Sequence, residues 1–151
     1  MKQFALPVRF GIATSGCLMA YFLILSLFGL HSNIFYSLFN SVITGFGIYE
    51  AIKYYRIKEG SSFSYGSGFV VGVVTGFMAT LIFTIAFAIY VTEVNTGFLQ
   101  ELSSVWFEDY NTSEGILFFT VAIMGFATTL VLTLAFMQLF KTSNNLKRKL
   151  E

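Results

Sequence analysis

The chain has 151 residues, of which 56% are hydrophobic and 11% are charged, with a formal net charge of +1 and a mean hydropathy of +0.73. A soluble domain of this size usually has about a quarter of its residues charged, because most surface positions need polar cover. The composition therefore excludes an ordinary soluble domain, and the near-neutral charge gives no electrostatic reason to expect a nucleic-acid partner.

The first part of the chain contains an uncharged stretch long enough for two membrane-spanning helices. No Lys, Arg, Asp or Glu lies between Arg9 and Glu50. A spanning helix needs about 20 mostly apolar residues to cross a hydrocarbon core about 30 Å thick. A polar tripeptide at 31–33 interrupts the stretch near its middle and predicts a tight turn. We therefore expect helices at about 10–30 and 34–55.

The connection at about 56–68 begins basic and then becomes rich in glycine and serine. Gly60 can end the second helix in a left-handed conformation, and Gly66 and Gly68 mark the start of the third. Free backbone N–H groups at that start, beside basic residues, could hold a lipid phosphate. A flexible turn next to membrane-anchoring cations is the plainer interpretation.

The remaining sequence predicts two more spanning helices, at about 69–91 and 115–140. Helix is the expected element, because backbone groups in lipid must bond within their own segment or in a closed barrel, and these runs lack the alternation of a barrel strand. The predicted fold is a single all-α domain covering residues 1–151, an integral membrane four-helix bundle.

All nine Lys and Arg residues fall on one side of this four-span arrangement: in the amino-terminal tail, at the end of the second helix, and in the tail at 141–151. The segment at 92–114 has none, and it contains five acidic residues instead. Basic residues are retained on the cytoplasmic side of a membrane. We therefore expect both termini in the cytoplasm and the acidic loop outside.

The outer loop at 92–114 has a helical pattern of its own. Phe98, Leu102 and Val105 recur at helical spacing with polar residues between them, and Trp106 is an aromatic type that favours the headgroup zone. This pattern predicts a short amphipathic interfacial helix, with Trp106 as an anchor. A lid or a docking surface is the alternative interpretation of the same segment.

Small residues recur at every fourth position of the third predicted helix and form one smooth stripe along it. The fourth predicted helix repeats the same spacing of glycine and threonine, which either convergence or an ancient duplication would explain. Small side chains let two helix backbones approach closely, so we expect the two stripes to form a close antiparallel pair. The predicted packing residues are Gly68, Gly72, Gly76, Thr80, Gly125 and Thr129.

The sequence offers no arrangement of residues that predicts catalysis. Glu50 and Lys53 lie three positions apart near the inner end of the second helix, where they can form an interfacial ion pair. The chain has one histidine, His31, and one cysteine, Cys17, which excludes a histidine triad, an internal disulfide and a cysteine metal cluster. We expect no enzyme activity, no metal and no cofactor.

Three segments resemble a bacterial membrane family: Gly45–Arg56, Phe63–Gly66 and Ile123–Thr129. The family is the one catalogued as domain of unknown function 4199, and the resemblance extends from about Phe10 to Lys141. It implies a small four-span protein of the inner membrane of Gram-negative bacteria. It implies no activity, so no functional residue is carried over from it.

These observations together predict a non-enzymatic interaction or accessory subunit of the inner membrane. Its expected partners are membrane lipid and either a second copy, through the third helix, or other membrane proteins. The alternative is a small oligomeric transporter or channel, which would need a hydrated cavity. An enzyme ranks third and would need a substrate cavity near Glu50. The side chains expected around a transport cavity are Thr44, Thr75, Thr80 and Gln138.

Overall fold

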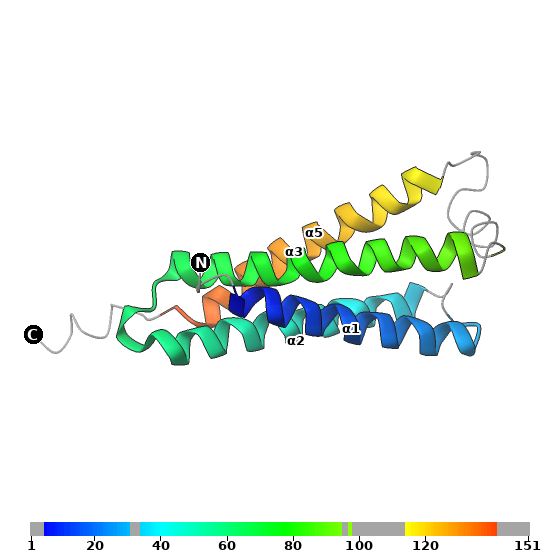
Figure 1. The fold of residues 1–151 in the computed structure, drawn as a ribbon. Coiled ribbons are helices and arrows are strands. Elements are labelled where there is room, and N and C mark those ends of the chain that lie inside the picture. The colour runs from blue at the N-terminus through cyan, green and yellow to red at the C-terminus, as the bar shows by residue number, and fades with distance from the viewer. Residues whose placement is uncertain (1–4, 31–33, 95–96, 98–113, 142–151) are drawn as a thin grey trace, which may run out of the picture.

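The computed structural model describes residues 5–30, 34–94, 97 and 114–141, and in these ranges the chain folds into long helices (Figure 1). Each helix runs antiparallel to the one before it, as in an up-and-down bundle. The predicted all-α bundle is therefore confirmed, whereas the predicted amphipathic helix lies outside the described residues. The long helices are α1 (Ala5–Leu27), α2 (Ile34–Glu59), α3 (Tyr65–Ile89) and α5 (Glu114–Leu139).

Three segments, α1, Tyr65–Val94 and Gly115–Leu139, are long and apolar enough to cross a membrane. Tyr65–Val94 combines α3 with a π-helical turn at Tyr90–Val94. α2 has sufficient length, with 26 residues, but it is less apolar because it contains polar residues and ends in a charged segment. The three apolar helices indicate a membrane protein, and α2 as a fourth span stays a prediction.

α1 begins at Ala5, earlier than the expected residue 10, and includes Pro7 in its first turn. Proline is tolerated there because the N–H groups of a first helical turn have no partner within the helix. The helix ends at a left-handed Gly29 with φ 66°. The Gly29 N–H donates to the Ser26 carbonyl at 3.1 Å and the Leu30 N–H to the Leu25 carbonyl at 2.9 Å, which satisfies two carbonyls of the last turn.

The connection between α2 and α3 is short. α2 continues to Glu59 and stops at Gly60, whose φ of 53° confirms the predicted left-handed end; a 3₁₀ turn at Gly60–Ser62 follows. Ser64 then caps α3, because its hydroxyl oxygen accepts a hydrogen bond from the Ser67 N–H at 3.2 Å. That amide is therefore engaged in the cap, which weakens the interpretation of this turn as a phosphate site.

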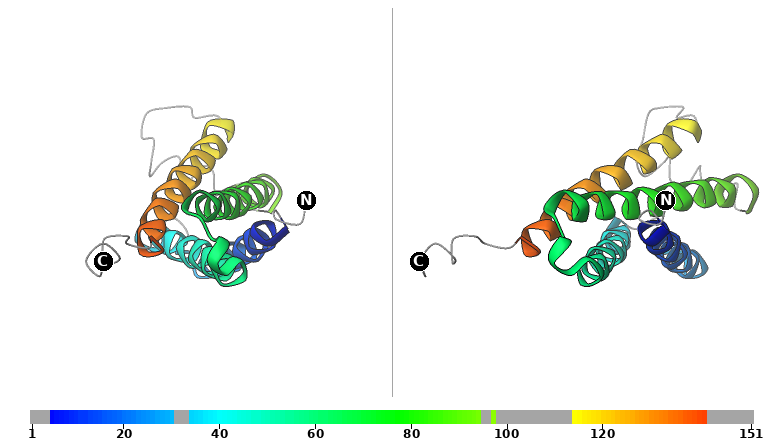
Figure 2. Two further views of the ribbon diagram at one scale, coloured as in Figure 1. Left: turned by 90° about the vertical axis from the view of Figure 1, so that its left-hand side faces the viewer. Right: turned by 60° about the vertical axis from the view of Figure 1, so that its left-hand side comes forward.

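α3 lies at the centre of the bundle and packs against each of the other three long helices, as the ribbon views show (Figure 1, Figure 2). α5 packs along α3, while its first turns lie on the opposite side of α3 from α2. The apolar core has two parts. One is made of Ile48, Ala51, Ile52, Tyr55, Val71, Met137 and Phe140, and the other of Phe22, Phe87, Val91 and Leu117.

Candidate functional site

The contact between α3 and α5, here called the seam, is made of three glycine–threonine pairs: Gly72 with Thr133, Gly76 with Thr129, and Thr80 with Gly125. A Cβ atom added at Gly72 would lie 2.6 Å from Thr133 Cγ2, and one added at Gly125 would lie 2.5 Å from Thr80 Cγ2. Real Cβ atoms essentially never come so close to another heavy atom. The two helices therefore lie at a separation that glycine alone permits.

The seam contains five of the six packing residues singled out from the sequence, together with Thr133. The sixth, Gly68, is also buried but meets different partners. A Cβ atom there would lie 2.7 Å from Phe63 Cζ and 3.0 Å from Met137 Cε. Gly68 thus fits between an aromatic ring of the preceding turn and the end of α5.

Two threonine hydroxyls of the seam have no hydrogen-bond partner. The buried Oγ1 atoms of Thr129 and Thr133 make no hydrogen bond, whereas the Thr14 hydroxyl donates to the Phe10 carbonyl at 2.8 Å. A Cβ atom added at Gly76 would point between the methyl and hydroxyl groups of Thr129. A glycine Hα atom in that direction can form a weak Cα–H···O contact. Close packing, rather than ordinary hydrogen bonding, holds the seam together.

The four side chains expected around a transport cavity do not share one space. Thr75 is fully buried and Thr80 is 6% exposed, and Thr80 packs into the seam. Thr44 is buried and donates to the Asn40 carbonyl at 2.8 Å. Gln138 is exposed on α5. Thr80 and Gln138 therefore do not line one cavity.

Two close helix contacts were missed by the sequence analysis, and both involve α1. A Cβ atom added at Gly11 would lie 2.7 Å from Met78 Cβ and 2.9 Å from the Thr75 carbonyl oxygen, so α1 meets the backbone of α3. Gly47 of α2 lies against the side chain of Thr14. Neither glycine belongs to a stripe. The sequence did contain one indication of these contacts. A glycine inside a helix costs about 1 kcal/mol relative to alanine, so an isolated glycine there indicates a position where a neighbouring helix packs closely.

Glu50 and Lys53 form the ion pair that their spacing predicts. The Lys53 Nζ atom lies 3.1 Å from Glu50 Oε1, and it also lies 5.8 Å from the centre of the Tyr49 ring. The two side chains are 31% and 46% exposed for Glu50 and Lys53 respectively. Exposed pairs of this kind contribute about 0.3–0.5 kcal/mol, so this pair orients Lys53 more than it stabilises the fold.

Every cationic side chain in the described part of the chain lies toward one end of the bundle, here called the cationic end. α1 begins there, and α2 and α5 end there (Figure 1). The Arg56 guanidinium packs over two rings, at 5.9 Å from the centre of Phe63 and 5.6 Å from that of Phe140. The cations at this end are Arg9, Lys53, Arg56, Lys58 and Lys141.

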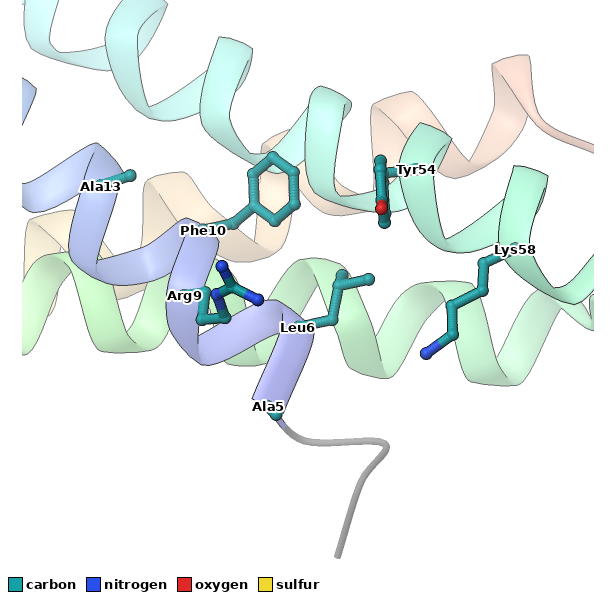
Figure 3. A pocket seen from close by; sticks show the side chains of 7 residues that line it. All are labelled: Ala5, Leu6, Arg9, Phe10, Ala13, Tyr54 and Lys58. Carbon is teal, nitrogen blue, oxygen red and sulfur yellow. The ribbon is translucent and has the colours of Figure 1, made fainter.

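A groove opens at the cationic end, between the first turns of α1 and the last turns of α2 (Figure 3). Its volume is about 460 Å³, and it is open to the surroundings rather than enclosed. Two cations from different helices lie on its two sides, and apolar and aromatic side chains lie between them. Its main lining residues are Leu6, Arg9, Phe10, Ala13, Tyr54 and Lys58.

No group of three or more His, Cys, Asp or Glu that could hold a metal ion occurs among the residues in the described ranges. The predicted anchor Trp106 lies outside those ranges. The seam, the groove and the exposed faces of the helices are the features of the described residues that bear on function.

A family model with the description "Protein of unknown function (DUF4199)" matches residues 9–142, which is most of the chain. The chain belongs to this family. The resemblance noted in the sequence is thereby confirmed. No curated protein and no solved structure matches this chain. Membership of DUF4199 brings no activity with it, so a function for this protein has to be argued from its own residues.

Proposed function

We propose that this DUF4199 protein is a non-enzymatic interaction or accessory subunit of the bacterial inner membrane. In this proposal it crosses the membrane four times and keeps both termini in the cytoplasm. The observation that carries the proposal is the close contact along the seam. At Gly72 and Gly125 a Cβ atom would already meet the facing helix within 2.6 Å, so the seam has no room for water or a solute. A transporter would need such room, either here or between copies of the chain.

The outer face of α1 supports a role in interaction. Gly16 is exposed, and no heavy atom lies within 4 Å of the place where its Cβ would be. Ala13, Cys17 and Ala20 on the same helix are exposed too. Small outward side chains allow another membrane helix to approach closely. The glycine stripe of α3 is occupied by α5, so α1 replaces the third helix as the face we expect a partner to use.

The exposed side of α2 supports the fourth span. Its amino-terminal half presents Phe35, Leu38 and Phe46 outward, each more than 60% exposed. The helix has 26 residues, which at 1.5 Å per residue gives about 39 Å, more than the hydrocarbon thickness of about 30 Å. Its charged residues begin at Glu50, so they lie near the cationic end. The acyl chains of the lipids would cover the apolar half of α2, and their headgroups would lie around its charged end.

The single native cysteine provides a direct test of interaction at α1. Oxidative crosslinking of Cys17 in native membranes is expected to give a dimer or an adduct with another membrane protein. The matched control removes that thiol by Cys17→Ser and places one on the outward face of α5 by Val131→Cys, a position that is 65% exposed. This control is expected to crosslink much less.

Intact-complex mass analysis in mild detergent completes the test. A complex that contains a second protein chain supports the proposal. Recovery of monomer with lipid alone, together with equal crosslinking at positions 17 and 131, would overturn it. A fused export reporter tests orientation separately. It is expected to be active when inserted near Glu108 and inactive after Glu151, and the reverse result contradicts the proposed topology.

A further inference from the structure

We propose that the groove at the cationic end binds the phosphate headgroup of an anionic phospholipid, with the start of an acyl chain on its apolar wall. This inference goes beyond the interaction role and does not depend on it. The two surfaces meet at Ala13, but the groove extends from there to the cationic end, whereas Gly16 and Cys17 lie further along α1.

The charge of the groove favours an anionic ligand. The groove is lined by the Arg9 guanidinium from α1 and the Lys58 ammonium from α2, and no acidic side chain is among the described residues that line it (Figure 3). An anion that enters the groove would be attracted by both cations. Guanidinium also binds phosphate oxygens in a bidentate manner, which favours a phosphate over a simple halide ion.

The two cations of the groove differ from the neighbouring cations of α2. Lys53 pairs with Glu50 at 3.1 Å, and Arg56 packs over the rings of Phe63 and Phe140. Within the described ranges, Arg9 and Lys58 have no comparable partner. Two of the four cations contributed by α1 and α2 are thus engaged inside the chain. The two that line the groove are free to bind a ligand.

The apolar wall of the groove favours a lipid over a free phosphate. The rings of Phe10 and Tyr54 lie 6.0 Å apart, and they form one side of the groove together with Leu6. Tyr54 remains 56% exposed although it is a large aromatic residue. Ala13 is exposed and small, which leaves space beside Phe10. The groove thus combines two cations with an apolar wall, and it lies next to apolar helices. This combination fits a molecule that has an anionic headgroup and a hydrocarbon chain.

Lipid binding to the purified full-length chain in detergent tests the proposal, with intact-complex mass analysis counting bound lipid. Wild-type protein is expected to retain phosphatidylglycerol at least tenfold more tightly than phosphatidylcholine. The variant Arg9→Gln/Lys58→Gln is expected to lose this preference. Lys141→Gln is the matched control, since it removes an exposed cation of the same end that does not line the groove, and it is expected to bind as wild type does.

A second variant tests the apolar wall without changing any charge. Ala13→Phe fills the groove from an exposed position, so it should leave the fold intact and weaken phosphatidylglycerol binding severalfold. Soluble glycerol phosphate in millimolar excess should not displace the lipid. Equal losses in Lys141→Gln and the double variant would overturn the proposal in favour of general charge attraction. Unchanged binding in Ala13→Phe, or displacement by glycerol phosphate, would overturn the assignment to a lipid.

Discussion

The two faces of α1 use glycine in opposite ways. Gly11 faces inward, where a Cβ atom would meet the Thr75 carbonyl oxygen of α3 at 2.9 Å. Gly16 lies little more than one helical turn later, faces outward and has open space around it. The first glycine is required by a contact inside the chain, and the second is available for a contact outside it. A glycine in an apolar helix therefore does not by itself show whether the helix packs there against its own chain or against a partner.

Gly11→Ala should have the largest effect of the substitutions that test this comparison. The added methyl meets a backbone oxygen and a Cβ atom of α3, neither of which can rotate away. Overpacking of this kind costs about 1–3 kcal/mol, and we expect a net loss of about 2 kcal/mol of unfolding free energy. Unfolding by SDS titration in mild detergent, followed by circular dichroism, measures it. Wild-type stability would contradict the close α1–α3 contact.

Gly72→Ala should have an intermediate effect, because the added methyl meets side-chain atoms that can adjust: Thr133 Cγ2 at 2.6 Å and Ile52 Cδ1 at 3.0 Å. We expect a loss of about 1 kcal/mol in the same titration. Combining it with Thr133→Ser, which removes the facing methyl group, should restore most of that stability, since the pair then keeps its total volume. Additive losses in the double variant would show that the two residues do not face each other.

Gly16→Ala should have the smallest effect, and of opposite sign. No contact opposes the methyl group, and alanine is favoured over glycine within a helix by about 0.5–1 kcal/mol, so the monomer should be slightly more stable. The same variant should nevertheless reduce crosslinking through Cys17, because the added methyl group keeps a partner helix from approaching the backbone of α1 as closely. A marked loss of monomer stability would mean that this face is packed inside the chain.

The sequence predicted the seam because its signal is periodic. Gly72, Gly76 and Thr80 recur at the spacing of one helical turn, and the matching spacing on α5 gave the partner. Gly11 and Gly47 carry no such periodicity, since each touches a different helix at a single point. No sequence pattern indicated the groove either. Arg9 and Lys58 are far apart in the sequence, and they line the same groove only because α1 begins at the end of the bundle where α2 ends.

The helix boundaries were also only partly predictable from the sequence. The left-handed end of α2 at Gly60 was predicted, because a glycine there follows a run of charged residues. The early start of α1 was not, since the expected span was placed in the uncharged stretch that follows Arg9. A first turn tolerates proline, and a cation at the membrane surface needs no interruption of the helix.

The central place of α3 has a consequence for the order of folding. α1, α2 and α3 contact one another and are joined by short connections, so they can assemble while the ribosome is still making the rest of the chain. α5 comes last, after a segment of some twenty residues between Val94 and Glu114. Its docking then depends on the match between its threonines and the glycines already in place on α3, and we expect it to follow the assembly of α1, α2 and α3.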